Sequence, residues 1–266
     1  PASKIPASDR HTYFLPSPKE AAALKLKPIL LFCLAALSAL TLQAGVDYST
    51  YERLLERYVR DEGVRYEAWA GNEEDLAALD RFLKQAAVVD VPALGEAGQK
   101  AFYINLYNAA MLQAVFEHWP LDSVEEIGLL PFSIFKKKFI RQGGRRLSLD
   151  EVEKEILLKE YSDPRIHFAV NCASESCPPL RTEPYVGARL DAQLDEQARR
   201  FARSEHAARI DAAEERVAFS ELFKWYADDF PGDHPAEYLN AWRDEKIPLD
   251  YATDWIPYDW SINAAE

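Results

Sequence analysis

The 266-residue chain has little cysteine, little methionine and no long hydrophobic run. It contains three cysteines and one methionine, and one of the cysteines lies in an apolar stretch near the N-terminus. That stretch, residues 28–42, is the longest apolar run and is shorter than the roughly 20 residues that a membrane-spanning helix needs. Neither a glycine- and serine-rich linker nor an internal repeat divides the sequence, so we expect one cored domain.

Positive charge is also scarce. The chain has 31 Lys and Arg against 44 Asp and Glu, a net charge of −13. Residues 1–44 hold five basic and two acidic residues, so the rest of the chain is more acidic still. Such a chain is not drawn to phosphate backbones or anionic lipid, and nucleic acid is not an expected partner.

One basic island stands against this excess of acid. A basic run is usually a solvated face of a protein. The alternative is contact with an anionic cell-wall component or a lipid head group. The island consists of Lys136, Lys137, Lys138, Arg141, Arg145 and Arg146.

The N-terminal region carries a targeting pattern. Lys25 and Lys27 precede the apolar run 28–42, and small residues follow at Ala44. A short basic region, an apolar core and a small residue at its end predict a signal peptide over 25–44. We therefore expect a periplasmic or secreted protein, cleaved near Ala44. The alternative is an uncleaved anchor.

Three regions follow from this pattern. Residues 1–24 contain four prolines and no apolar period, so we interpret them as a disordered or mis-called extension. Residues 25–44 are the expected signal peptide, and Cys33 should leave with it. Residues 45–266 are the expected single domain, with no transmembrane span in the mature chain.

Helical periodicity dominates this domain. The stretch 98–116 differs from the others because it is apolar nearly all round, so it is the expected core helix. We predict an α+β fold: a mostly helical single domain with a buried central helix packed on a small, mainly antiparallel sheet. Helices are expected at 46–60, 73–87, 98–116, 150–159 and 187–205. Strands are expected at 145–149 and 165–171, with a hairpin of 208–211 and 216–219.

Two asparagines interrupt the core helix. Asn105 and Asn108 are three residues apart and so share one face. Burying an amide without a partner costs about 1–3 kcal/mol, so a polar group must meet each of them. One interpretation is that they bind the backbone of a loop. The other is that they orient an imidazole or hold a substrate carbonyl.

The strongest chemical signal is the seventeen-residue stretch from Asp163 to Pro179. It holds His167, Cys172 and Cys177 together with hydroxyl and amide side chains. A strand histidine is most often a half-buried structural residue. Nearby thiols favour a role for His167 as their base, since a thiol needs a base or cation close by to ionise at neutral pH.

The two thiols have three interpretations. In an exported protein they would pair by default, and a four-residue gap permits a small stapling disulfide. Alternatively, one thiol is a nucleophile, with Cys177 held rigidly by Pro178 and Cys172 following directly on the predicted strand. The third interpretation is a redox couple, although the spacing is not the two-residue gap of thioredoxin-like motifs. No common zinc spacing matches, so we expect neither a metal nor a cofactor.

Four motifs together resemble the DUF547 family, a domain of unknown function. The resemblance implies that Asn105, Asn108, His167, Cys172 and Cys177 form one cluster. The order of a buried helix and a histidine segment is also similar to the core of papain-like thiol enzymes, although those enzymes carry the nucleophile on the helix. The motifs are 101–109 (AFYINLYNA), 163–180 (DPRIHFAVNCASESCPPL), 220–230 (SELFKWYADDF) and 258–263 (YDWSIN).

Two functions remain open on the sequence. The preferred hypothesis is a binding module with a cysteine-containing loop and an aromatic groove for a peptide, a glycan or an envelope protein. The alternative is a thiol-dependent hydrolase or acyl transferase. In it Cys177 or Cys172 attacks an amide or ester, His167 acts as base, and Asn105 or Asn108 orients the imidazole or stabilises an oxyanion.

Overall fold

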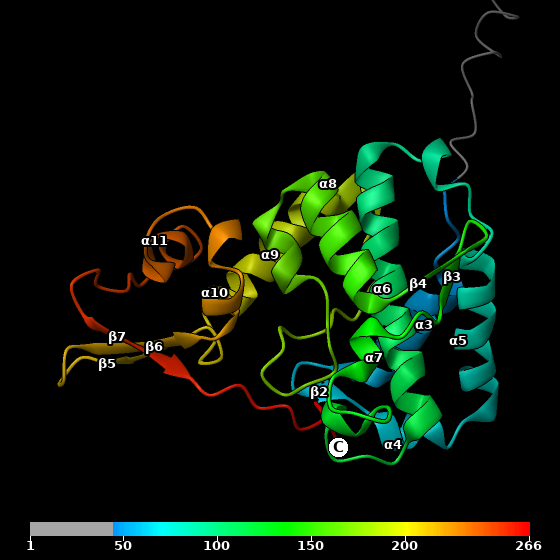
Figure 1. Ribbon diagram of the computed structural model, residues 1–266, viewed down its shortest axis with the longest axis horizontal. Helices are drawn as coiled ribbons and strands as arrows, with labels where there is room; N and C mark the ends of the chain where they lie inside the picture. Colours follow the sequence, from blue (N-terminus) through cyan, green and yellow to red (C-terminus); the bar gives the residue numbers. More distant parts are fainter. Residues whose placement is uncertain (1–44) are drawn as a thin grey trace, which may run out of the picture. The chain divides into compact units, whose positions relative to one another are not determined.

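The computed structural model describes residues 45–266 (Figure 1). The predicted extension over 1–24 and the predicted signal peptide over 25–44 lie outside the described residues. Within 45–266, no helix is both long enough and apolar enough to cross a membrane.

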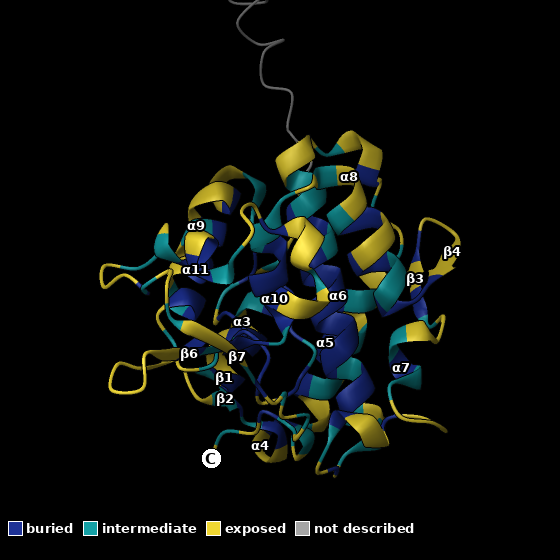
Figure 2. Cartoon of the chain, turned by 60° about the vertical axis from the view of Figure 1, so that its left-hand side comes forward, coloured by how far each residue is buried: buried dark blue, intermediate teal, exposed yellow. Residues whose placement is uncertain are grey.

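The core helix is α6, Glu96–His118. Its central turns are apolar nearly all round, and Figure 2 shows these turns enclosed by the rest of the domain. Helix α5, Glu73–Ala86, packs along one side, and the helical segment η3, Glu151–Leu158, packs on another. The predicted buried helix is therefore confirmed and extends two residues further at each end.

The N-terminal part packs on α5 and α6 through aromatic side chains. Tyr51 stacks on Phe82 with ring centroids 4.7 Å apart, and Tyr58 stacks on Trp69 at the same separation. Aromatic pairs of this kind add to the free energy of area burial. The elements of this part are α3 (Ser49–Tyr58), β1 (Val59–Arg60), β2 (Gly63–Val64) and α4 (Tyr66–Ala70).

The described strands form small sheets. Three pairs are antiparallel, and β7 joins β6 in parallel. The predicted 208–219 hairpin is confirmed, with Ala208 opposite Phe219. The remaining strands are β3 (Ile140–Gln142), β4 (Arg145–Leu147), β5 (Ala208–Asp211), β6 (Arg216–Ser220) and β7 (Ala252–Ile256).

A second hydrophobic cluster surrounds Phe168. The ring of Phe168 stacks on Phe201, with centroids 4.9 Å apart, and also contacts Phe223 and Phe230. This cluster joins the three-stranded sheet to the helical core. Its helices are α9 (Leu190–Ala202), α10 (Leu222–Trp225) and α11 (Pro235–Asn240). The α+β class predicted from the sequence is confirmed.

The predicted strand over 165–171 was wrong. Residues Pro164–Phe168 form the 3₁₀ helix η4 instead. Asp163 caps it by accepting a hydrogen bond from the Arg165 amide at 3.1 Å, and Pro164 supplies a helical φ at its first turn. Alternating apolar residues over so short a stretch do not distinguish a strand from a helical turn.

The predicted helix over 150–159 is present, but most of it is a π-helix. Segment η3 spans Glu151–Leu158 and continues into α8, Lys159–Tyr161. π-helical turns are rare and occur frequently at functional sites. This segment carries Glu153 toward the interior, where only 8% of the residue is exposed.

Candidate functional site

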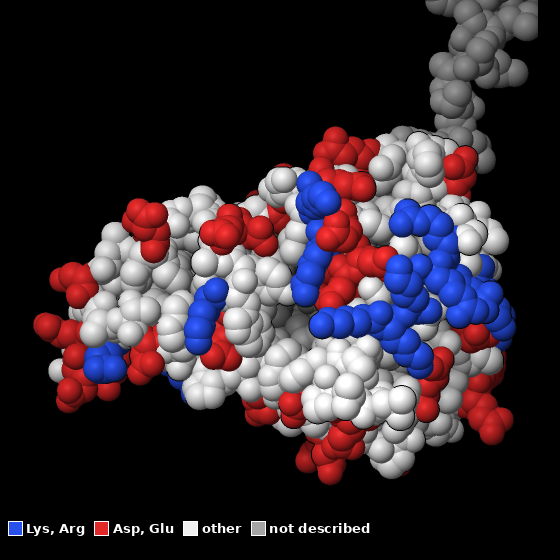
Figure 3. Space-filling model, viewed as in Figure 1, with Lys and Arg blue, Asp and Glu red and all other residues white. Residues whose placement is uncertain are grey.

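A cavity of about 530 Å³ opens where η3, η4, α7 and α10 meet, and α7 spans Ser133–Lys136. Figure 3 shows the surface hollowed in this region. The volume is within the range of small-molecule sites. Of the predicted site residues, His167, Cys172 and Cys177 line the cavity. Its aromatic walls are Tyr107, Phe132, Phe135, Trp225, Tyr226, Tyr258 and Trp260.

The two cysteines lie together in the loop after η4, and both are free thiols. No disulfide joins them, so the predicted staple is not present in the described structure. The backbone N–H of Cys172 donates a hydrogen bond to Sγ of Cys177 at 3.0 Å. Cys172 is half-buried and Cys177 is buried.

The surroundings of the two thiols separate their pKa values. A hydrogen bond from the Cys177 thiol lowers the pKa of Cys172 to about 7, helped by the hydroxyls of Ser174 and Tyr258 and opposed by burial. These hydroxyl oxygens lie 3.0 Å and 3.4 Å from Sγ of Cys172. Burial raises the pKa of Cys177 well above its usual range, and the Cys172 sulfur adds to this rise. Of the two thiols, Cys172 is therefore the one that ionises more readily.

Asn171 folds the cysteine loop onto itself. Its side-chain oxygen accepts a hydrogen bond from the Ala173 amide at 3.0 Å, and its side-chain nitrogen donates to the Pro178 carbonyl at 2.8 Å. Ala173 has φ of 64°, a left-handed conformation that L-residues rarely adopt. Such local strain occurs where surrounding contacts impose it, often at functional sites.

The C-terminal segment holds the other side of this loop. Ser174 pairs with Ile262 in an antiparallel bridge. The Glu175 amide donates to the Ser261 carbonyl at 2.8 Å, and the Asn263 amide donates to the Ala173 carbonyl at 3.0 Å. The chain end thus positions Tyr258 over Cys172, although 86 residues separate the two.

His167 faces the cavity from η4 and pairs with an acid from a distant segment. Its Nε2 lies 2.9 Å from Oδ2 of Asp229. The carboxylate only accepts hydrogen bonds, so Nε2–H donates and Nδ1 remains the proton acceptor of the ring. Burial lowers the pKa of His167, against the effect of Asp229. Within residues 45–266, no hydrogen bond joins His167 to either thiol.

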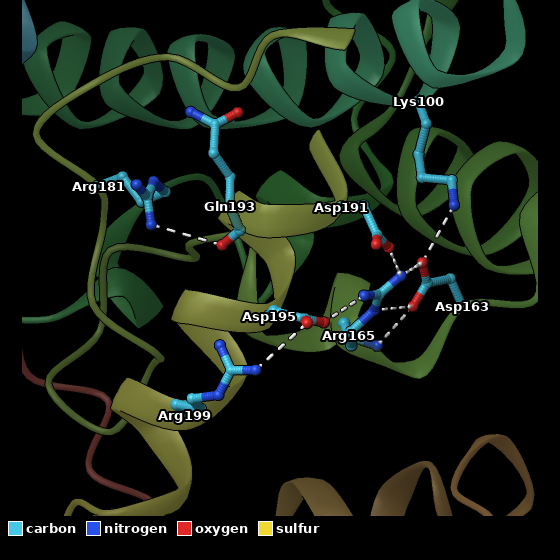
Figure 4. A network of polar contacts seen from close by, with 8 residues as sticks. All are labelled: Lys100, Asp163, Arg165, Arg181, Asp191, Gln193, Asp195 and Arg199. Carbon is cyan, nitrogen blue, oxygen red and sulfur yellow. Dashed lines mark hydrogen bonds and ion pairs between the residues drawn. The ribbon is translucent and has the colours of Figure 1, made fainter. Parts of the chain in front are cut away.

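Segment η4 itself is fixed by an ionic network on its far side (Figure 4). Arg165 bridges Asp163 at 2.9 Å and Asp191 at 2.8 Å, and it also bonds Asp195 of α9. Lys100 of α6 reaches Asp163 at 3.1 Å. These half-buried pairs tie η4 to α6 and α9 and so set the position of His167.

Asn105 and Asn108 do not line the cavity. The amide of Asn108 donates to the Ala169 carbonyl at 2.9 Å, and its oxygen accepts from the Asn171 amide at 2.8 Å. Asn105 makes the same pair of bonds to the backbone of Tyr185, at 2.7 Å and 2.9 Å. The geometry corresponds to the loop-fixing interpretation, and Asn108 acts on the backbone between His167 and Cys172.

Glu153 lines the cavity and is a site residue that sequence reasoning missed. It receives a hydrogen bond from the Tyr226 hydroxyl at 2.9 Å. Burial raises its pKa, which favours the neutral carboxylic acid. The available signal was its place among Val152, Ile156 and Leu157, on the apolar face of the helical pattern.

Asp229, Tyr226 and Tyr258 were also missed as site residues. All three lie in the motifs 220–230 and 258–263, which supported the family resemblance but suggested no role. In the described residues, no group of three or more His, Cys, Asp or Glu side chains is placed to hold a metal ion.

The buried carboxyl of Glu153 provides a stability prediction. Its raised pKa means that folding opposes its ionisation, so stability is lost as the pH rises above the ordinary Glu pKa near 4.3. Glu153→Gln should therefore be more stable than the parent protein near pH 7, and the difference should shrink toward pH 4. Urea unfolding at both pH values measures this, with exposed Glu155→Gln as the control. An equal difference at both pH values would contradict it.

A protein-family model matches the part of the chain that contains His167 and both cysteines of this site. The model of the family described as "Protein of unknown function, DUF547" matches residues 92–202, so this part of the chain is similar to that family. It contains α6, η3, η4 and the cysteine loop. A search of curated proteins found no match. A search of solved structures also found none.

Proposed function

We propose that this chain is a thiol-dependent hydrolase or acyl transferase with Cys172 as its nucleophile. The observation that carries the proposal is a half-buried thiol, lowered in pKa to about 7, that lines a cavity large enough for a small molecule. A thiolate at neutral pH is the reactive form of cysteine. The lowered pKa of Cys172 and the raised pKa of Cys177 favour Cys172 in this role.

The chemistry has two steps. The Cys172 sulfur forms a bond to the carbonyl carbon of an ester or amide, and the leaving group departs with a proton. Glu153 is suited to donate that proton because burial raises its pKa and so favours the neutral carboxylic acid. In the second step water or another nucleophile attacks the thioester and releases the thiolate. Nδ1 of His167 accepts the proton of that nucleophile, while Asp229 stabilises the imidazolium. Transfer of this proton through solvent to the Glu153 carboxylate then restores both groups for the next turnover.

A chromogenic ester tests the proposal directly. With p-nitrophenyl acetate in excess, we expect a burst of one nitrophenolate per chain, followed by slower turnover. Mass spectrometry of digested protein should place the acetyl group on Cys172. An acetyl group found on exposed lysines only, with no burst, would reject the proposal.

The ionisation of Cys172 provides a second measurement. The rate of alkylation by iodoacetamide should rise with pH and level off around an inflection near 7, since only the thiolate reacts. Tyr258→Phe removes one hydrogen-bond donor and should move the inflection upward. A parent profile with its inflection at the ordinary thiol value of about 8.5 would contradict the low pKa.

A non-catalytic binding module is the second candidate. The aromatic walls favour it, in particular Trp225, Tyr258 and Trp260, whose rings lie 4.5–5.9 Å apart. Such a surface suits a peptide, a glycan or an envelope protein. Ligand binding that leaves Cys172 unmodified, together with no burst, would favour this function.

Export to the periplasm or outside the cell is likewise proposed, from Lys25, Lys27 and the apolar run 28–42. N-terminal sequencing of the protein recovered from cell fractions tests it. A periplasmic form beginning near Gly45 supports export, and a cytoplasmic form retaining residues 25–44 opposes it.

A further inference from the structure

A fully exposed pair of leucines lies at the tip of the loop before α7. Leu129 is 100% exposed and Leu130 is 70% exposed. The base of the loop is fixed, because the Phe132 ring packs on Trp260 with centroids 4.6 Å apart. Gly128 and Phe132 adopt positive φ on either side of the tip. The leucines are therefore held away from the core by a defined backbone, and their apolar surface has no partner within the described residues.

Basic side chains follow directly along the chain. The basic island occupies the end of α7 and the strands β3 and β4, and all six of its side chains are exposed. Of these six side chains, only Lys138 forms an ion pair within the described residues, and its Nζ lies 2.6 Å from a carboxylate oxygen of Glu151. Figure 3 shows Lys and Arg side chains gathered over β3 and β4, next to uncharged surface over α7.

We propose that this face docks on a lipid bilayer that contains anionic lipid, with the Leu129–Leu130 tip in the interface and the basic island against the phosphates. Aliphatic side chains insert at the boundary between head groups and acyl chains, and each nearby cation adds attraction to an anionic leaflet. A nucleic acid or a free phosphate would contact the cations and leave both leucines in water. Only a surface with an apolar interior beneath anionic groups would contact both the two leucines and the basic island.

The net charge of −13 does not oppose this docking strongly. Salt screens charges over about 10 Å at 0.1 M ionic strength, so a surface senses mainly the charges that face it. The local excess of cations therefore decides the attraction.

The docking face adjoins the cavity. Phe132 and Phe135, which lie in the sequence between the leucine tip and the basic island, line the cavity, and so does Lys136 of the island. A docked molecule would thus place the cavity mouth at the membrane surface, within reach of an amphiphilic ester or amide. The docking proposal stands without the thiol chemistry, because none of the residues that carry it ionises or reacts in that scheme.

Vesicle co-sedimentation tests the proposal on the full chain. Binding to vesicles of phosphatidylcholine and phosphatidylglycerol should exceed binding to phosphatidylcholine alone. Lys137→Gln/Arg141→Gln/Arg145→Gln should weaken the binding by roughly 100-fold, and Leu129→Ser/Leu130→Ser by about tenfold or more. The control Arg209→Gln/Arg216→Gln/Lys246→Gln removes the same charge from the β5–β6 end and should change little.

Every variant also contains the apolar run 28–42. Hydrogen exchange therefore serves to show whether the docking face or that run contacts the vesicles. Amides of residues 128–132 should gain protection only with the anionic vesicles. Equal binding to both vesicle types, or equal loss in the control and the basic-island variant, would overturn the proposal. So would binding to duplex DNA that the leucine substitutions leave intact while vesicle binding is absent. Iodoacetamide reactivity of Cys172 should stay unchanged in all three variants, which keeps the two proposals separable.

Discussion

Replacing Cys172 with alanine should abolish acylation by p-nitrophenyl acetate. Of the two thiols within residues 45–266, the variant lacks the one whose pKa is lowered by its surroundings, so no acyl-enzyme forms and the burst disappears. Loss of a nucleophile leaves only binding and electrostatic effects, so we expect a rate at least about 10⁴-fold lower. Stopped-flow absorbance of nitrophenolate measures the burst.

The matched control is Cys177→Ala, which removes the neighbouring thiol and keeps the nucleophile. Here the burst should persist while the inflection of its pH profile moves up toward the ordinary thiol value of about 8.5. Only a modest change in rate is expected near pH 7, because a more basic thiolate is also a stronger nucleophile. The position of the inflection is therefore the informative quantity. A burst lost in Cys177→Ala and kept in Cys172→Ala would reverse the assignment.

Sequence periodicity predicted the frame of this site because the frame is local. The apolar pattern of α6 and the amphipathic pattern of α5 show that these helices bury apolar side chains, whichever segments they pack against. The grouping of His167, Cys172 and Cys177 was also expected, because all three lie within one short stretch of the sequence. The residues that contact them from the opposite wall of the cavity could not be predicted from the sequence.

The partners of the site come from distant segments. Asp229 reaches His167 across 62 residues, Tyr226 reaches Glu153 across 73, and Tyr258 reaches Cys172 across 86. No spacing rule connects residues at such separations. The choice between the two thiols depends on these contacts, so the sequence left Cys172 and Cys177 open as alternatives.

The 3₁₀ helix at Pro164–Phe168 shows the same limit in the backbone. Alternation of apolar residues suggested a strand, but a strand needs a neighbour to accept and donate its hydrogen bonds. Here Asn108 supplies both partners, to Ala169 and Asn171, from a helix 61 residues away. One buried amide thus replaces a strand neighbour at this point in the core.

Asn108→Leu should therefore destabilise the protein strongly. The Ala169 carbonyl and the Asn171 amide are both buried, and the substitution leaves them without their side-chain partner. Each orphaned group costs about 1–3 kcal/mol, so we expect a loss of about 2–5 kcal/mol and a Tm lower by roughly 10 °C. Urea unfolding and differential scanning calorimetry measure these quantities.

Asn105→Leu is the matched control, because Asn105 makes the same two bonds to Tyr185 from the same helix face. Both variants should lose similar stability. Only Asn108→Leu should also change the alkylation profile of Cys172, since Asn108 holds the amide of Asn171, whose side chain shapes the cysteine loop. If both variants move the inflection equally, the effect is a general loosening of the core, and Asn108 does not position the thiol.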